Sequence, residues 1–302
     1  MTLTQLRAFV AVADAGSVRA AAERLVVTQP AVSAAVGALQ RSLGSDLVEP
    51  HGRGLRLTEA GQVFAGYARR VLGLLEEAET AASGGADPTR GNLRIAAVTT
   101  ASEHVLPRSL ASFLDDYPHV GLRLEVGNRE QVWSLLLQHE VDIALAGRPP
   151  ADADVRTRAV RPNELVVVAA PGRAPTGRVS LAQLESKTWL LREAGSGTRA
   201  ALQRSMDAAG IDPPVLTLGS NGAVVAAATA GLGFGLVSRD AVDREVASGE
   251  LRVVDVEGTP IERPWHAVTH LDTTPTAELF VAHLTDRARP HPPPRFDASP
   301  GR

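Results

Sequence analysis

The sequence predicts an α+β winged helix-turn-helix domain plus a long linker helix, followed by an α/β domain. Three observations predict this fold class. Three short amphipathic helix patterns precede a glycine-flanked ribbon, a long apolar helix pattern follows, and strands alternate with helices beyond a glycine-rich break. The chain has 302 residues, which accommodates two domains at about 150 residues each.

The three short helices are predicted from apolar residues at helical spacing. The first stripe spans residues 6–13 and is followed by a Gly-Ser pair in which Ser17 can cap the second helix. Thr28 can cap a third helix that Gly44 ends. Pro30 falls in the first turn of that helix, where its missing N–H costs nothing.

A two-stranded ribbon and a long helix follow. Residues 47–48 and the alternating run 55–57 form the two strands, and the glycine-flanked segment 52–54 forms the tip. Thr58 can cap a helix that extends to the linker-like segment 83–88. Because a surface helix of this length needs a partner for its apolar stripe, we expect it to pair with a second copy of the chain.

The predicted third helix has two different faces. Its inward row is apolar and consists of Val32, Val36, Leu39 and Leu43. Its opposite row is small and polar and consists of Gln29, Ser33, Gly37, Gln40 and Arg41. Gln29 and Ser33 are best placed to reach base edges in the major groove of double-stranded DNA, since Gln can bond adenine through two hydrogen bonds. Arg53 at the ribbon tip, with Arg56 nearby, suits phosphate or minor-groove contact.

The local charge agrees with DNA binding only modestly. Residues 1–57 hold six arginines against four acidic residues, a balance of +2, so tight binding should need more than one copy. Any small helical bundle shows similar apolar stripes, and that alternative interpretation applies to the three helices alone. The ribbon and the long helix favour the DNA-binding interpretation.

Composition excludes several classes of protein. The chain contains no cysteine, which excludes disulfide frameworks, thiolate nucleophiles and Cys-ligated zinc. The formal net charge of -3 argues against a protein that coats nucleic acid by bulk attraction. The amino terminus lacks a secretory pattern and no run of about 18 apolar residues occurs, so we expect a cytoplasmic protein with no membrane span. The sequence predicts no catalytic residues, no metal site and no cofactor.

Beyond the linker, short apolar runs alternate with helix patterns and predict a mostly parallel sheet. The predicted strands are 93–98, 122–126, 141–146, 165–169, 189–191, 215–218, 234–237 and 266–269. The predicted helices are 106–114, 131–137, 199–209, 224–230, 241–247 and 276–284.

Polar residues cluster where strands end and helices begin. The candidate binding residues in these clusters are Thr99, Thr100, Asn128, Arg129, Ser196, Thr198 and Arg199. Free N–H groups at helix starts favour anions, and Arg129 and Arg199 can bind a carboxylate or phosphate. The simpler alternative is that these Thr, Asn and Ser side chains only cap helices. Taken together, the clusters predict a pocket for a small molecule, and our hypothesis is that this ligand is anionic.

Five short segments stand out in the first part of the chain: 6–13, Gly16-Ser17, 21–25, 28–33 and 52–61. Together they resemble the LysR-type transcriptional regulators. The resemblance covers the whole chain up to the expected tail and is most specific over about the first 65 residues. The resemblance implies that Gln29, Pro30 and Ser33 face the major groove and that Arg53 serves in the wing. Ala34 and Pro50 stand where a basic residue is usual, so the DNA contacts would depend more on Arg53, Arg41 and the linker helix.

The resemblance also implies a two-lobed effector domain like a periplasmic binding protein, with the effector between the lobes, and tetramers made from dimers bound to adjacent DNA sites. The chain would cross between lobes near residues 161–163 and return near 262–264. The expected boundaries are 1–58 for the winged domain, 59–86 for the linker helix, 91–161 with 265–288 for the first lobe, 162–264 for the second lobe, and 289–302 for a proline-rich disordered tail.

A shorter match extends into the second lobe. The segments 218–222, which contains Asn221, and 230–239 are similar to the subgroup that controls carbon-fixation and sulfur-assimilation genes. By this similarity Asn221 joins the candidate effector residues. The rival interpretation is an enzyme or solute-binding protein on the same two-lobed fold. The missing secretory signal counts against transport, and the absence of nucleophile and acid–base motifs counts against catalysis.

Overall fold

The computed structural model describes residues 1–52, 54–84, 87–286 and 296–298. The chain forms two compact units: one holds residues 1–83 with the short segment 137–141, and the other holds residues 84–136 and 142–302. Arg53, the predicted wing-tip residue, and most of the predicted tail lie outside the described residues.

The first unit begins with a three-helix bundle. Its helices are α1 (Leu3–Ala15), α2 (Val18–Leu25) and α3 (Gln29–Leu43). The predicted caps are confirmed, because the side chains of Ser17 and Thr28 accept hydrogen bonds from the backbones of α2 and α3. Gly44 ends α3 in the left-handed conformation, as predicted. The predicted apolar row is buried except for Leu43, the last residue of α3, which is 40% exposed.

The predicted ribbon consists of β1 (Val48–His51) and β2 (Gly54–Leu57), paired antiparallel. It is fastened to the bundle at two points. The Leu55 N–H donates to the Gly16 carbonyl at 2.7 Å. The amide oxygen of Gln40 accepts from the N–H groups of Leu47 and Val48 at 2.8 and 3.1 Å. The Gln40 side chain therefore binds the backbone at the start of the ribbon. The prediction that Gln40 belongs to the free polar face of the third helix is wrong.

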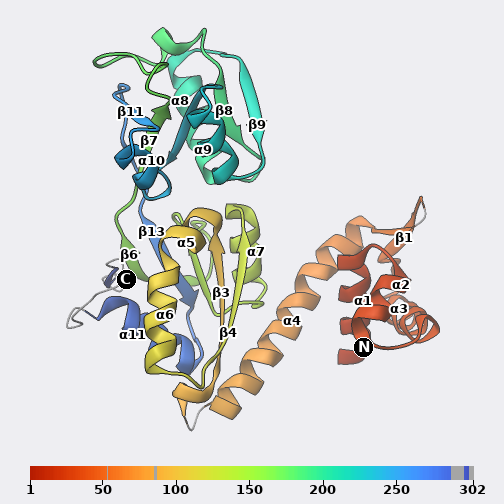
Figure 1. Cartoon of the computed structure of the whole chain (residues 1–302). Coiled ribbons are helices and arrows are strands. Elements are labelled where there is room, and N and C mark those ends of the chain that lie inside the picture. Colours follow the sequence, from red (N-terminus) through yellow and green to blue (C-terminus); the bar gives the residue numbers. More distant parts are fainter. Residues whose placement is uncertain (53, 85–86, 287–295, 299–302) are drawn as a thin grey trace. The chain divides into compact units, whose positions relative to one another are not determined.

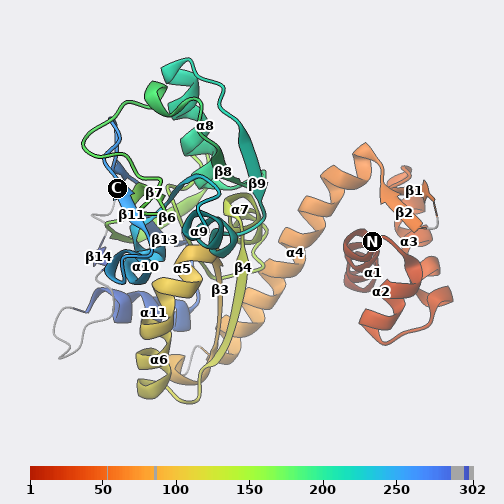
Figure 2. The ribbon, with the colours of Figure 1, turned by 45° about the horizontal axis from the view of Figure 1, so that its top comes forward.

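Helix α4 (Glu59–Gly84) is the long helix, and Thr58 caps it as predicted, accepting from the Gly61 N–H at 2.9 Å. Gly61 lets α4 approach the bundle, because a Cβ there would lie 1.9 Å from the Leu47 carbonyl oxygen. In Figures 1 and 2 the three helices and the ribbon lie together at the start of α4. Among the described residues, no helix has the length and apolar character needed to cross a membrane.

The second unit contains two six-stranded sheets, which we call the first and second lobes. The first lobe follows the 3-10 turn η1 (Pro88–Arg90), and its sheet has the order β14-β6-β13-β5-β3-β4. Its strands are β3 (Asn92–Val98), β4 (Gly121–Gly127), β5 (Ile143–Ala146), β6 (Val155–Arg161), β13 (Trp265–His270) and β14 (Asp297–Ala298). Its helices are α5 (Thr99–His104), α6 (Leu106–Asp116), α7 (Arg129–Leu137) and α11 (Pro275–Thr285). Strands β3, β4 and β5 are parallel, and α6 and α11 pack on the apolar core.

The second lobe has a sheet of order β11-β7-β10-β8-β9, with β12 also paired to β7. Its strands are β7 (Glu164–Ala169), β8 (Trp189–Arg192), β9 (Val215–Leu218), β10 (Phe234–Ser238), β11 (Arg252–Val254) and β12 (Ile261–Glu262). Its helices are α8 (Gly197–Ala209), α9 (Asn221–Thr229) and α10 (Asp243–Ala247), with 3-10 turns η2 (Ala182–Leu184) and η3 (Arg239–Ala241). Strand β10 is parallel to β8 and antiparallel to β7.

Two chain segments connect the lobes side by side (Figure 1). The Arg263 N–H donates to the Asn163 carbonyl at 2.8 Å, and the Asn163 amide donates to the Arg263 carbonyl at 2.8 Å. Arg161 forms two hydrogen bonds with Asp240, at 2.7 and 2.9 Å, and Trp265 donates to the same carboxylate at 3.2 Å. Burial raises the pKa of Asp240, but Arg161 and the Trp265 N–H overcome it and hold that pKa below its ordinary value.

The structure corrects three expectations for this unit. The prediction of a mostly parallel sheet is wrong, because among the described residues six of the ten strand pairings in the two lobes are antiparallel. Strands β6, β11 and β12 were not predicted; in β6, arginines interrupt the apolar residues and leave no apolar run. The expected disorder from residue 289 onward is wrong at residues 296–298. Phe296 is buried in the core of the first lobe, and Asp297–Ala298 pair with β6. The proline-rich composition around these residues predicts disorder. The burial of Phe296 holds the short strand in place, and a composition argument does not detect a single buried residue.

Candidate functional site

The first candidate site is the solvent-facing side of α3. Gln29, Pro30, Ser33 and Arg41 are all exposed there. Within the described part of the chain, the side chains of Gln29 and Ser33 have no hydrogen-bond partner and Arg41 has no carboxylate partner. The face thus offers small polar groups and one cation without an internal partner, and these groups suit base edges and phosphates.

The ribbon contributes less free charge than the sequence indicated. Arg56 was expected near a phosphate, but its guanidinium donates to Glu49 on the opposite strand at 2.6 Å. This pair is exposed, so water and salt screen it. Of the cations predicted for the DNA-facing surface, Arg41 is the one that the described residues leave unpaired.

The second candidate site lies between the two lobes, where two cavities adjoin. We call the smaller one, of about 40 Å³, the inner pocket. It is lined from both lobes by Thr99, Thr100, Asn128, Arg129, Arg192, Ser196, Gly197, Thr198, Asn221 and Arg263, among others. We call the larger one, of about 710 Å³, the outer cavity; Arg129, Ser196, Gly197 and Arg263 line it as well. The eight sequence-predicted effector residues all line one or both cavities.

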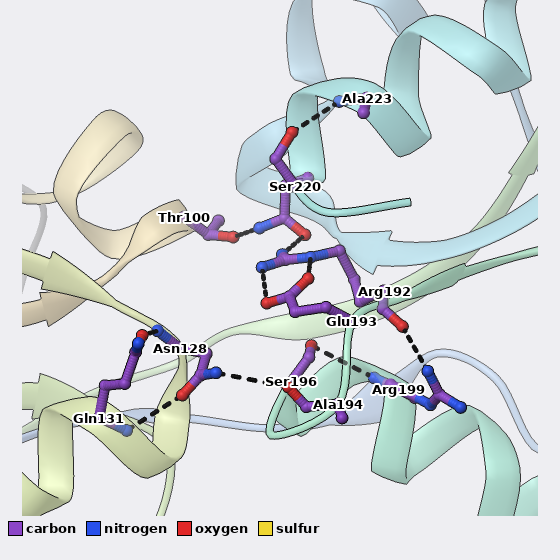
Figure 3. Close-up of polar contacts among 11 residues, drawn as sticks. Thr100, Asn128, Gln131, Arg192, Glu193, Ala194, Ser196, Arg199, Ser220 and Ala223 are labelled. Atoms are coloured by element: carbon purple, nitrogen blue, oxygen red, sulfur yellow. Dashed lines mark hydrogen bonds and ion pairs between the residues drawn. The ribbon is translucent and has the colours of Figure 1, made fainter. Parts of the chain in front are cut away.

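Three residues that line the inner pocket, Thr100, Arg192 and Asn221, belong to a chain of polar contacts that ends at Glu193 (Figure 3). The Asn221 amide nitrogen donates to the Thr100 hydroxyl of the other lobe, and Arg192 donates to the Asn221 amide oxygen. Arg192 also donates to both carboxylate oxygens of Glu193, at 2.7 and 2.8 Å. Burial raises the pKa of Glu193, and the Arg192 hydrogen bond and charge outweigh it, so that pKa lies below its ordinary value. Polar side chains that line the inner pocket therefore already have hydrogen-bond partners within the protein.

Two predicted residues mainly cap helices. The Asn128 side-chain oxygen accepts from the Gln131 backbone N–H at 3.0 Å, and the Gln131 side-chain oxygen accepts from the Asn128 backbone N–H at 2.9 Å. The two hydrogen bonds form a reciprocal cap at the start of α7. Ser196 accepts from the Arg199 N–H at 3.5 Å at the start of α8. The Asn128 amide also donates to the Ala194 carbonyl of the second lobe at 3.4 Å. The capping alternative thus holds for both residues, and Asn128 in addition links the lobes.

The outer cavity is rich in arginine. Its charged lining residues are Arg129, Arg148, Arg199, Arg204, Glu262, Arg263 and His266. Burial, together with the charges of Arg129 and Arg204, lowers the pKa of the Arg263 guanidinium. Burial is also the main reason that the pKa of His266 lies below its ordinary value, and the Arg148 charge adds to the effect. The described residues contain no group of three or more His, Cys, Asp or Glu arranged to hold a metal ion.

Sequence reasoning missed four arginines of these cavities: Arg148, Arg192, Arg204 and Arg263. Two of them carried a usable signal. Arg192 is the last residue of the parallel strand β8, and Arg148 follows β5 by two residues. Ligands of open α/β sheets bind at the carboxyl ends of strands, so a charged residue at such a position is a candidate ligand-binding residue. Arg204 lies inside α8 and Arg263 in a connecting segment, and no local pattern marks either one.

The two units together define a class of protein, namely a winged helix-turn-helix DNA-binding domain joined to a two-lobed α/β ligand-binding domain. Residues 3–62 match the bacterial regulatory helix-turn-helix protein family of lysR type, and residues 86–289 match the LysR substrate binding domain. The chain belongs to the LysR family of transcriptional regulators.

Curated relatives point to one subgroup. The chain is 37% identical to the HTH-type transcriptional regulator CbbR of Rhodospirillum rubrum, over 95% of this chain and 97% of the relative. It is 38% identical to the RuBisCO operon transcriptional regulator of Allochromatium vinosum, over 96% of this chain and 98% of the relative. These relatives match the carbon-fixation subgroup that the segments 218–222 and 230–239 indicated.

Two solved structures are similar to parts or most of the chain. The Synechocystis CcmR regulatory domain in complex with 2-PG has a TM-score of 0.60 and 30% identity, and the match covers 64% of this chain and 94% of that one. Full-length CbnR complexed with its target DNA has a TM-score of 0.62 and 25% identity, and the match covers 94% of this chain and 98% of that one.

Proposed function

We propose that this LysR-type regulator controls carbon-fixation genes by binding operator DNA through α3 and an anionic small molecule between its lobes. The observation that supports it most is the exposed face of α3, where Gln29, Pro30, Ser33 and Arg41 lie together. CbnR, which is similar over most of the chain, has been solved with its target DNA. Because operator DNA lies in the cytoplasm of a bacterial cell, the regulator acts there.

The face of α3 suits a major groove because it is narrow and polar. Gln29 and Ser33 are one turn apart and both reach outward, so they can address neighbouring bases. Pro30 lies between them without an N–H group, and Arg41 lies near the other end of the helix, in reach of a phosphate. Arg53 of the wing completes the proposed contact set, although it lies outside the described residues.

Helix α4 supports the proposed dimer. Its large exposed apolar residues are Val63, Tyr67, Val71 and Leu74. Their spacing of four, four and three residues places them on one side of the helix, as in a coiled-coil seam. Val63 and Tyr67 also border an apolar groove of about 570 Å³ with Leu43 and Leu47. We propose that a second α4 covers this stripe and that two such dimers form a tetramer on adjacent DNA sites.

The inner pocket supports an anionic effector. Arg192 and the hydroxyl of Thr100 meet there beside Asn221, and these groups can bind a carboxylate or phosphate once the lobes adjust. The CcmR regulatory domain, which is 30% identical, has been solved with 2-PG. The curated relatives are named as transcriptional regulators, and we propose that this chain likewise has no catalytic activity.

The experiment that tests this function uses fluorescence anisotropy with labelled DNA from the intergenic region beside the gene of this chain. We expect saturable binding at low salt, and a change in affinity or in the mobility of the complex when 2-PG is added at constant ionic strength. A panel of neutral and cationic compounds of similar size is the comparison. No binding to this DNA, or a response only to neutral or cationic compounds, would contradict the proposal.

A matched pair of variants locates the effector. Thr100→Val removes the hydroxyl that reaches Asn221 across the lobes and keeps the shape of the side chain. Thr176→Val makes the same change on an exposed loop of the second lobe. We expect the first variant to weaken the response to 2-PG at least about tenfold and the second to leave it unchanged. Equal responses of the two variants would show that the effector does not use the inner pocket.

A further inference from the structure

Strand β6 lies beside β14, the outermost strand of the first-lobe sheet in the described part of the chain (Figure 2). Along one side β6 is antiparallel to β13 from Val155 to Arg161. On its other side it pairs, among the described residues, with Asp297–Ala298 at Val160 and Ala159. A strand with an open side exposes N–H and C=O groups that can pair with another segment. The open side of β6 is therefore a surface for an extended peptide, and this chain's own short strand occupies one end of it.

Phe296 anchors this short strand. Its side chain is 2% exposed and belongs to the apolar core of the first lobe, which also contains Ala159, Trp265 and Phe280. Two paired residues do not make a stable strand by themselves, because ordering their backbone costs more free energy than so few pairings return. Burial of an aromatic side chain is among the largest apolar contributions that one residue can make. The strand is therefore held mainly through Phe296, and replacing that residue should release it.

The anchored segment lies beyond the part of the chain that matches the family. The match to the LysR substrate binding domain ends at residue 289, after α11. Phe280 and Val281 of α11 belong to the same apolar core as Phe296. The segment therefore packs against elements inside the matched region while lying outside that region itself. It is an addition to the matched domain, and its effect on that domain can be tested separately.

The paired end of β6 leads directly into one of the two connections between the lobes. Val160 pairs with Asp297 on one side and with His266 of β13 on the other. The next residue, Arg161, forms two hydrogen bonds with Asp240 of the second lobe, at 2.7 and 2.9 Å. Strand β13 carries the chain that returns from the second lobe, so β6 lies between that returning strand and the added one. The added strand thus fixes β6 immediately before the residue that joins the lobes.

We propose that residues 296–298 act as a clasp: Phe296 packs into the first lobe, Asp297–Ala298 pair with β6, and together they hold the end of β6 that leads to the second lobe. Hinge motion between two bodies is absorbed by a few residues at the ends of elements. While the clasp is bound, β6 is paired on both sides there, and the motion is confined to the residues from Arg161 onward. Release of the clasp extends the hinge into β6. This inference does not depend on the proposed DNA or effector binding.

The test follows amide hydrogen exchange of the full chain by mass spectrometry. Phe296→Ser removes the anchor, and we expect exchange in the peptide that covers residues 155–163 to become at least about tenfold faster. Ala298→Ser is the matched control, because it changes an exposed side chain of the same strand and keeps the anchor. Its exchange should stay within about threefold of the wild type, as should that of β4 at the opposite edge of the sheet in both variants.

A free peptide separates binding of the clasp from a general loss of stability. A chain shortened to end at Arg295 lacks the clasp, and its exchange over residues 155–163 should be as fast as that of Phe296→Ser. A synthetic peptide of residues 294–300 is then added at about millimolar concentration, which is comparable to the effective concentration of a segment on a short tether. We expect this peptide to restore slow exchange, and the same peptide carrying Phe296→Ser to have no effect.

Three results would overturn the proposal. Unchanged exchange over residues 155–163 in Phe296→Ser would mean that the segment does not hold β6. An equal increase in β4 would mean that Phe296 only stabilises the core as a whole. Restoration by both peptides or by neither would mean that the open side of β6 does not recognise this segment. If Phe296→Ser does not fold, Phe296→Leu keeps an apolar anchor and should show the same local change at about threefold or more.

Discussion

The exposed face of α3 and the cleft between the lobes were both predicted from small polar residues near helix starts, and they use those residues in different ways. On α3, the Gln29 and Ser33 side chains are exposed and make no hydrogen bond within the described residues. In the cleft, Asn221 bonds Thr100 and Arg192, and Asn128 and Ser196 cap helices. One surface is available to a partner, and the other is occupied by its own contacts.

The α3 face is free and the cleft residues are paired because the first is formed within one helix and the second by segments distant in the sequence. A helix face is set by its own periodicity, so residues opposite the buried row of α3 are free wherever nothing else folds over them. The contact between Thr100 and Asn221 joins residues 121 positions apart. A ligand entering the inner pocket must exchange existing hydrogen bonds, whereas DNA approaching α3 only displaces water. Substitutions on α3 should therefore act on binding, and substitutions in the cleft on stability as well.

The largest expected effect is that of Ser33→Glu on DNA binding. A carboxylate on the exposed face of α3 would meet the negative potential of the groove, so affinity for operator DNA should fall at least about 100-fold. Fluorescence anisotropy with the intergenic DNA measures this loss. Binding of 2-PG and the oligomeric state should stay unchanged, since Ser33 is exposed and lies outside the buried core of the bundle.

Thr4→Glu is the matched control, because it adds the same charge in the first turn of α1, where a carboxylate is favourable. Its affinity for DNA should remain within about threefold of the wild type. If both variants lose DNA binding equally, bulk charge would explain the result and the α3 face would have no special role.

In the cleft, the largest effect should come from Arg192→Met. Arg192 is 7% exposed and satisfies both Glu193 and Asn221, so its loss leaves polar groups without partners and should destabilise the second unit by about 2–3 kcal/mol. Chemical denaturation followed by circular dichroism measures this change. Arg123→Met breaks the exposed pair with Glu125 and should cost less than about 0.5 kcal/mol. Equal costs would show that the buried polar chain contributes nothing.

Most of the fold could be predicted because its signals are local. The stripes of α1 to α3, the caps Ser17 and Thr28, and the alternation of strands with helices all lie within short windows of sequence. Strand β6 and the short strand after Phe296 have no such window, because their neighbours in the sheet determine them. Their strand character depends on pairing with segments distant in the sequence.

The candidate sites divide in the same way. The free face of α3 was predictable apart from Gln40, whose amide is used by the ribbon seven and eight residues further on. In the cleft, the helix-start residues were predictable, Arg129 and Arg199 among them, but Arg204 and Arg263 were not. Arg192 ends a buried strand, and Arg263 is brought beside Arg129 only by the return of the chain between lobes.

An intermediate effect is expected for Gln40→Leu. This variant compares a residue of α3 that binds the ribbon with Gln29 and Ser33, which face solvent. The Leu47 and Val48 N–H groups would lose their acceptor, and the first unit should lose about 1–2 kcal/mol of stability. DNA affinity should fall only severalfold, because the ribbon loosens while Gln29 and Ser33 stay in place. Gln62→Leu, on the exposed side of α4, is the control and should change neither quantity. A loss of DNA binding as large as that of Ser33→Glu would place Gln40 among the DNA contacts instead.

The smallest effect concerns the connection between the lobes and depends on pH. Because Arg161 and Trp265 hold the pKa of Asp240 below its ordinary value, the carboxylate stabilises the folded state above about pH 4. That contribution is lost as the pH falls through the lowered value. Asp240→Asn should therefore be less stable than the wild type by about 1 kcal/mol near neutral pH, with the gap closing in acid.

Urea denaturation at a series of pH values between about 3 and 7 measures this gap. Asp212→Asn, at an exposed position with no ion pair among the described residues, is the control and should show no gap at any pH. A constant difference for Asp240→Asn over the whole range would mean that its carboxylate charge is not what joins the lobes. The connection would then depend on the Asn163 and Arg263 backbone contacts, which do not titrate.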